Sequence, residues 1–275
     1  MSPLFDGPPP RPPNRIVSLV PSLTESLFSL GLGDRVVGVT DWCVHPAAEV
    51  ARLPKVGGTK DADPERIVAL APDLVIANQE ENTRRVVEDL DARGLDVWVT
   101  YPRTVREGAE LLLQVARLGA GEDARREVVE PVLAAVASAE RAREGRESLP
   151  RVFCPIWRDP WMAPSRDTYI HDMIALCGGE NVTAEIARDD PRRRLRASPE
   201  RYPKLALEEI VDLAPDVVLL PDEPYAFTAV DVRELAALAM PAAQSGRIHL
   251  IDGTWVSWYG PRIRTAIGAL SRYLE

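Results

Sequence analysis

Four of the six tryptophans lie in two short segments in the second half of the chain. Trp157 and Trp161 belong to the segment WRDPW, and Trp255 and Trp258 belong to the segment DGTWVSW. Because Pro, Asp and Gly surround them, these rings are expected in loops. Aromatic side chains bury a large apolar area at a small cost in rotamer entropy, so such loops suit a large, flat ligand. The competing interpretation is that these four rings are ordinary core aromatics.

Residues that hold metal ions are sparse. His45, His171 and His249 are far apart, with no His-x-His or other close pair. Protein sites for bare metal ions usually gather several His, Cys or carboxylate ligands, so we predict no metal site. His45 follows an expected strand and is retained as a candidate ligand contact. The three cysteines form no CxxC pair and are expected to be small buried side chains.

Catalytic motifs are missing from the sequence. It contains no GxSxG, HExxH, GxxxxGK or GxGxxG segment. Cys43 and His45 are close in sequence, but this proximity alone does not make a nucleophile and its base. We therefore predict no catalytic residues and no resident cofactor, and a protein that is not an enzyme.

Composition limits the function classes further. The chain has 275 residues, enough for two lobes, and a formal net charge of −9, which opposes binding to nucleic acid. Its 45% hydrophobic residues support a packed core. The sequence contains no run of 18 apolar residues, so we predict no membrane-spanning helix. The residues before Arg15 lack the basic and apolar regions of a secretory signal, so we expect an extended, Pro-rich leader.

Strands and helices alternate along both ends of the chain. Strands are predicted at residues 15–20, 35–40, 74–77 and 96–100, with helices between them, and this order is typical of a parallel sheet covered by helices. Residues 104–149 show no strand pattern, and a long helix is predicted from Glu122 to Glu147. After Pro150 the alternation resumes, with strands at 151–156, 217–220 and 248–251.

An internal repeat relates the two alternating regions. Residues 64–76 read PERIVALAPDLVI, and residues 207–219 read LEEIVDLAPDVVL. Each copy predicts a helix, a Leu-Ala-Pro-Asp turn and a strand. The predicted fold is α/β, with two Rossmann-like lobes around parallel sheets joined by one long backbone helix. The predicted segments are a leader (1–14), an N-terminal lobe (15–103), a helical segment (104–149) and a C-terminal lobe (150–275).

Three segments carry a resemblance to a known family. RIVSLVPSLTE, DRVVGVTDWCVHP and DPERIVALAPDLVIA resemble the helical-backbone (class III) substrate-binding proteins of ABC importers, and most closely the cobalamin-binding members. The resemblance covers most of the chain from Arg15 onward. It implies a monomer that captures one small ligand in a cleft between its lobes and delivers it to an ABC permease dimer. It also implies a periplasmic or cell-surface location.

The resemblance assigns roles to individual positions. The ligand contacts that it implies or that lie in the same loops are Pro21, Ser22, Trp42, His45, Thr59, Gln79, Trp157, Trp161, Tyr202, Trp255 and Trp258. Thr59 departs from the pattern, because cobalamin receptors have a tryptophan there. Glu65 and Glu208, one in each repeat copy, match the acidic residues that contact the transporter. Their alternative role is to complement a helix dipole.

Several alternatives stay open. The ligand can be haem or a ferric siderophore, or the chain can be a cytoplasmic corrinoid-binding protein, as the leader sequence allows. Some metallocluster enzymes share the two-lobed architecture. The basic run formed by Arg192, Arg193, Arg194 and Arg196 either meets an anionic group of the ligand or is a solvated loop.

Overall fold

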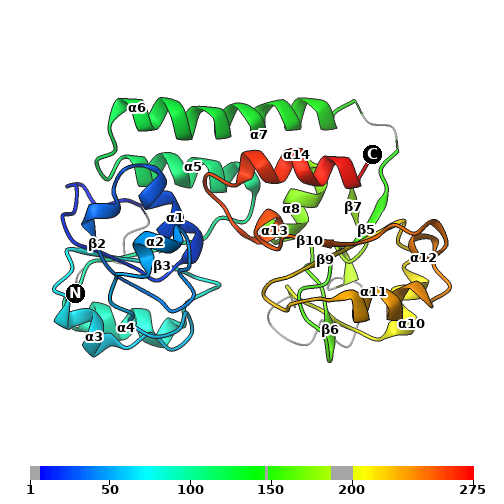
Figure 1. The fold of residues 1–275 in the computed structure, drawn as a ribbon, viewed down its shortest axis with the longest axis horizontal. Helices are drawn as coiled ribbons and strands as arrows, with labels where there is room; N and C mark the ends of the chain where they lie inside the picture. Colours follow the sequence, from blue (N-terminus) through cyan, green and yellow to red (C-terminus); the bar gives the residue numbers. More distant parts are fainter. Residues whose placement is uncertain (1–6, 146–147, 187–200) are drawn as a thin grey trace. The chain divides into compact units, whose positions relative to one another are not determined.

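The computed structural model describes residues 7–145, 148–186 and 201–275 (Figure 1). The chain forms two compact units. The N-terminal unit comprises Met1–Pro102, Arg106–Ala134 and Tyr259–Pro261, and the C-terminal unit comprises Arg103–Val105, Ala135–Trp258 and Arg262–Glu275. Each unit is built around its own parallel sheet, so the predicted α/β fold class is confirmed.

The N-terminal unit contains a four-stranded parallel sheet in the order β2-β1-β3-β4. The strands are β1 (Ile16–Ser18), β2 (Val36–Val39), β3 (Leu74–Asn78) and β4 (Val97–Thr100). Every residue of β1 and β3 is buried, as expected for central strands covered on both faces. Its helices are α1 (Pro21–Ser29), α2 (Ala47–Val50), α3 (Pro64–Ala69), α4 (Arg84–Ala92) and α5 (Val105–Ala116), with a 3₁₀ turn η1 (Gly33–Arg35).

Helices cover both faces of this sheet. Ile67 of α3 and Leu90 of α4 pack in one hydrophobic cluster with the strand residues Val17, Val75 and Val97. Figure 1 shows α3 and α4 on one side of the sheet and α5 on the other. The side chain of Asp63 caps α3 by accepting hydrogen bonds from two backbone amides of its first turn, as its sequence predicts.

The C-terminal unit contains a second four-stranded parallel sheet in the order β10-β9-β5-β7 and a two-stranded antiparallel ribbon of β6 and β8. The strands are β5 (Arg151–Phe153), β6 (Trp161–Met162), β7 (Glu180–Asn181), β8 (Lys204–Leu205), β9 (Val217–Pro221) and β10 (Ile248–Ile251). The helices are α8 (Tyr169–Leu176), α10 (Leu207–Asp212), α11 (Ala229–Ala236), α12 (Pro241–Ser245), α13 (Thr254–Ser257) and α14 (Ile263–Tyr273).

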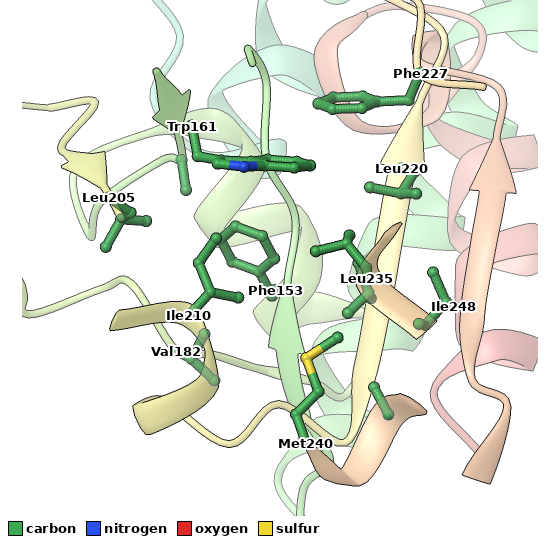
Figure 2. Close-up of a cluster of buried hydrophobic side chains, with 13 residues drawn as sticks. Phe153, Trp161, Val182, Leu205, Ile210, Leu220, Phe227, Leu235, Met240 and Ile248 are labelled. Carbon is green, nitrogen blue, oxygen red and sulfur yellow. The ribbon is translucent and has the colours of Figure 1, made fainter. Parts of the chain in front are cut away.

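One face of the second sheet contributes side chains to the buried hydrophobic cluster shown in Figure 2. Phe153 of β5 and Leu220 of β9 pack there with Ile210 of α10, Leu235 of α11 and Met240. Because large apolar side chains from strands and helices meet in one place, this cluster fixes where β5 and β9 end. The loops that follow these two strands therefore start from a rigid base.

A continuous helix from Glu122 to Arg143 contains the point where the chain passes from one unit to the other, at Ala134 and Ala135. It consists of α6 (Glu122–Ala124), the π-helical segment η2 (Arg125–Val129) and α7 (Glu130–Arg143). This helix lies within the predicted range, which ended at about Glu147, and residues 146 and 147 lie outside the described part of the chain. Among the described residues, no helix combines the length and apolarity needed to cross a bilayer.

Candidate functional site

Most of the predicted ligand contacts of the N-terminal unit lie in loops at one edge of its sheet. Because β1 to β4 run parallel, their carboxyl ends share that edge. Pro21 and Ser22 begin α1 just after β1, Trp42 lies in the loop after β2, and Gln79 directly follows β3. The exception is Thr59, which lies in the loop between α2 and α3. Its carbonyl oxygen is hydrogen-bonded to Asn82, in the loop after β3.

Two buried asparagines tie the loops of this edge together. Asn82 Nδ2 donates hydrogen bonds to the carbonyl oxygens of Leu19, at 3.3 Å, and Thr59, at 2.9 Å. Asn82 Oδ1 accepts from the backbone amide of Asn78, and Asn78 Oδ1 accepts from the amide of Glu80, both at 2.8 Å. Buried amide side chains that satisfy several backbone groups make a loop cluster rigid. Thr59 is thereby brought beside the loops that follow β1 and β3.

The loop that carries Trp42 is anchored by its neighbour Cys43. The Cys43 thiol lies 3.1 Å from the hydroxyls of both Thr24 and Thr40. Burial raises the pKa of Cys43, although the two hydroxyls oppose the shift, and this environment is typical of a buried structural thiol. Trp42, the residue before this anchor, is 66% exposed. An exposed indole on a fixed loop is suited to contact a ligand.

Gly58 brings Trp42 and Thr59 together. A Cβ atom at Gly58 would lie 3.6 Å from Trp42 Nε1, so the indole approaches the backbone immediately before Thr59. Such a Cβ would also approach the Asp61 carboxylate, which would have to move to admit it. Trp42 and Thr59 therefore occupy one surface. This proximity is required if Trp42 is to take the role of the tryptophan that the resemblance leads us to expect at position 59.

Tyr259 is a residue of this unit that the sequence did not predict. Its phenol donates a hydrogen bond of 3.2 Å to Glu81 Oε1, in the loop after β3. Burial is the main cause that raises the pKa of Tyr259 well above its ordinary value, and the Glu81 charge adds to it, whereas the Ser22 hydroxyl opposes it. Tyr259 is far from this loop in sequence and lacks a motif, so no sequence signal points to it.

His45 is half-buried on the loop after β2, just before α2. The other two histidines lie on α8 and β10 of the C-terminal unit. Within the described ranges, no group of three or more His, Cys, Asp or Glu side chains is placed to hold a metal ion.

In the C-terminal unit, aromatic residues follow three neighbouring strands at the carboxyl edge. Trp157 follows β5, Tyr225 follows β9, and Trp255 lies on α13 after β10. Trp157 is 44% exposed, and its ring meets the Tyr225 ring edge to face at 5.6 Å between centroids. Tyr225 is a second residue that the sequence analysis missed, although its place after an all-buried strand was a usable signal.

Two predicted tryptophan contacts lie in the core. Trp161 is 5% exposed and stacks on Phe227, with 5.6 Å between ring centroids and 9° between ring planes (Figure 2). It belongs to β6, which pairs with β8, and not to a loop. Trp258 is 7% exposed, and the Arg262 guanidinium lies 4.9 Å from its ring centroid. Both positions match the competing interpretation as core aromatics, and their contact with a ligand stays a prediction.

The remaining second-lobe candidates are half-buried. Trp255 is partly exposed on α13, and Tyr202 lies beside Arg201, whose guanidinium is 5.9 Å from the Tyr202 ring centroid. The basic run Arg192, Arg193, Arg194 and Arg196 lies outside the described residues.

A separate cavity lies at the opposite, amino edge of the C-terminal sheet. Pro150, Asp216 and Arg247, which precede β5, β9 and β10, contribute to its lining. It contains none of the predicted ligand contacts. The candidate surfaces are therefore defined by the carboxyl-edge loops, in agreement with the usual position of ligand sites in parallel sheets.

Both predicted transporter contacts are exposed. Glu65 lies in the first turn of α3 and Glu208 in the first turn of α10, at corresponding points of the repeat. The neighbouring Glu209 is engaged differently, because its Oε2 accepts a hydrogen bond of 2.7 Å from the Ala206 amide. Glu209 therefore caps its own helix, although both glutamates are exposed, and the role of Glu208 in transporter contact stays a prediction.

Residues 16–254 match the family model described as periplasmic binding protein, so the chain belongs to this family. It is 24% identical over 255 residues to the vitamin B12-binding protein of Pectobacterium carotovorum, covering 92% of this chain and 86% of that protein. The structure is similar to the periplasmic heme-binding protein RhuT of Roseiflexus, with a TM-score of 0.76, 26% identity and coverage of 94% and 97% of the two chains. It also resembles the vitamin B12 binding protein BtuF of Vibrio cholerae, with a TM-score of 0.79, 21% identity and coverage of 96% and 97%.

Proposed function

We propose that this chain is the substrate-binding protein of an ABC importer, and that it captures a corrinoid, preferably cobalamin, for delivery to the permease. The observation that carries the proposal is that each carboxyl edge presents an exposed tryptophan, Trp42 at 66% and Trp157 at 44%, in a member of the periplasmic binding protein family. Curated relatives over nearly the whole chain are vitamin B12-binding proteins. These findings favour solute binding over catalysis. They also favour a periplasmic location.

The aromatic contacts supply most of the expected affinity. Two aromatic walls that bury about 200 Å² of apolar surface would contribute roughly 5 kcal/mol before the costs of association. Trp42 and Trp157 offer exposed rings for this role, and Trp255 is half-buried at the same edge as Trp157. Peripheral amides of a corrin ring need polar partners, which we assign to Thr59 and Gln79, because Ser22 is only 3% exposed.

Haem is the second candidate ligand. The specific observation in its favour is the likeness to the heme-binding protein RhuT at 26% identity over 94% of this chain. Haem is also a large, flat metal chelate, so the aromatic residues alone do not separate it from a corrinoid. The two ligands differ in their peripheral groups, which are amides in a corrinoid and carboxylates in haem.

A titration of the purified, ligand-free protein with cobalamin, haem and a panel of ferric siderophores tests the proposal. We expect cobalamin to bind at micromolar concentrations or below, with a shift of its visible spectrum and quenching of tryptophan fluorescence. Failure to bind cobalamin at micromolar concentrations would overturn the assignment. Tight binding of haem or of one siderophore in the same titration would then identify the ligand class.

A further inference from the structure

Acidic side chains lie at the same sheet edge as the ring pair of Trp157 and Tyr225. Tyr225 follows β9, and the loop between the end of that strand and Tyr225 contains Asp222 and Glu223. Asp252 follows the adjacent strand β10. Because β9 and β10 are parallel neighbours, these three carboxylates lie at the same edge as the ring pair.

Neutral groups of the protein hold each of these carboxylates. Asp222 Oδ1 accepts from the Gly253 amide at 2.7 Å, and Asp252 Oδ1 accepts from the Thr254 amide at 2.9 Å. Glu223 Oε1 accepts from the Ser257 hydroxyl at 2.9 Å. These bonds fix the orientation of the carboxylates without neutralising their charge. The rim beside the ring pair therefore offers hydrogen-bond acceptors that carry negative charge.

The negative charges of Asp222 and Asp252 affect the ionisation of Glu223. Burial is the main cause that raises the pKa of Glu223, and the charges of Asp222 and Asp252 raise it further, against the hydrogen bonds from Ser257 and Trp258. A negative group on a ligand placed here would meet the same repulsion.

Two arginines of this unit, Arg158 and Arg262, contact other side chains. Arg158 pairs with Asp231 and Glu234 of α11, and its guanidinium lies 5.5 Å from the Trp161 ring centroid. Arg262 lies against Trp258 and donates to Thr254 Oγ1 at 3.0 Å, and this hydroxyl donates in turn to Asp252 Oδ1 at 2.5 Å. Neither contact places a guanidinium on the Trp157–Tyr225 pair.

We propose that Trp157 and Tyr225 form the face of the C-terminal unit that meets the ligand, and that Asp222, Glu223 and Asp252 select a ligand edge that bears amide N–H donors over one that bears carboxylates. The selection rests on charge complementarity, because an amide donates to a carboxylate whereas a second carboxylate is repelled by it. This inference rests on the proposed function and deepens it. It assigns specificity to three acidic residues and a contact to Tyr225.

A matched pair of corrinoids tests the selection. Cobinamide carries peripheral amides, and cobyrinic acid carries carboxylates on the same ring and cobalt. We expect the full chain to bind cobyrinic acid at least about tenfold more weakly than cobinamide in low salt, with the ratio falling as salt is added. The variants Asp222→Asn, Glu223→Gln and Asp252→Asn should each reduce this ratio, and the triple variant should nearly remove it. Asp212→Asn makes the same charge change at the last residue of α10 and should leave the ratio unaltered.

Ring substitutions test the contact. Tyr225→Leu should weaken cobinamide binding about tenfold, whereas Tyr225→Phe keeps the ring and should retain most of the affinity. Thermal unfolding of both variants separates loss of contact from loss of fold. Equal affinity for the two corrinoids, preference for cobyrinic acid, or a ratio that the triple variant does not change would overturn the selection while leaving corrinoid binding intact. Absence of binding by either corrinoid would instead overturn the proposed function.

Discussion

The backbone amide of Arg151 donates a hydrogen bond of 2.9 Å to Asp216 Oδ2, and the amide of Asp216 donates one of 2.8 Å to the Arg151 carbonyl. Arg15 and Asp73 form the same pair in the N-terminal unit, at 3.0 and 2.8 Å. Asp216 and Asp73 end the two Leu-Ala-Pro-Asp turns of the repeat. Each aspartate thus joins the start of one strand to the start of its neighbour, which explains why the turn sequence recurs.

Asp216→Ala should destabilise the protein by about 1–3 kcal/mol, because the Arg151 amide loses a charged acceptor at a partly buried position. Urea unfolding measures the loss. Asp216→Asn keeps an acceptor oxygen and should cost less than the alanine variant. Equal stability of the wild-type and alanine proteins would show that water replaces the carboxylate.

The same turns contain a strained alanine. Ala71 and Ala214 both have a φ of 43°, in the left-handed region that disfavours residues with a side chain. Ala214→Gly should leave stability unchanged or raise it by up to about 1 kcal/mol, because relief of strain outweighs the greater freedom of the unfolded chain. Ala134→Gly, in the helix that includes α7, is the control and should lower stability by about 0.5–1 kcal/mol. A thermal midpoint that falls equally in both variants would contradict this account.

The parts of the fold that could be predicted from the sequence are those set by local patterns. The repeat, with Pro72 and Pro215 ending their helices, predicted two related α/β regions, and the apolar runs located the strands. The burial of Trp161 was not predicted, because it depends on the pairing of β6 with β8, which are more than 40 residues apart in sequence. Tyr259 was missed for the same reason, since its place beside Glu81 is set by tertiary structure alone.

Trp157 and Trp161 should respond differently to truncation. Trp161→Ala removes a buried ring from the core and should cost about 3–5 kcal/mol of stability. Trp157→Ala removes an exposed ring, so it should cost less than about 1 kcal/mol but weaken cobalamin binding about tenfold. Chemical unfolding and ligand titration of both variants provide the comparison. An unaltered affinity in a folded Trp157→Ala protein would remove Trp157 from the binding surface.

Stability should depend on the ionisation of Glu223. Because burial, together with the charges of Asp222 and Asp252, raises its pKa above the ordinary value of 4.5 in the folded state, the folded protein binds this proton more tightly than the unfolded chain. The free energy of unfolding should therefore fall as pH rises from about 4.5 through the raised pKa and then level off. Glu223→Gln removes this loss, so the variant should be more stable than wild type near neutral pH and gain nothing in acid. Parallel stability profiles of the two proteins would contradict the shift.

Glu65 and Glu208 should act in transport and not in ligand capture. Both are exposed in the first turns of α3 and α10, and neither lies in the carboxyl-edge loops that carry the proposed ligand contacts. The double variant Glu65→Arg, Glu208→Arg should bind cobalamin with unchanged affinity, because no contact to the ligand is altered. It should lose stimulation of the cognate permease's ATPase activity in proteoliposomes, because each reversed charge would now repel the basic surface expected on the partner.

Reversal of two other exposed helical glutamates, Glu110 and Glu130, makes the same change in net charge and is the matched control. This control should stimulate the permease as the wild type does. Single reversals should give intermediate stimulation that recovers poorly at high salt, since added salt screens attraction and repulsion alike. If the double variant stimulates the permease normally, the two glutamates serve only their own helices, where a negative charge at the amino end stabilises by about 0.3–1 kcal/mol.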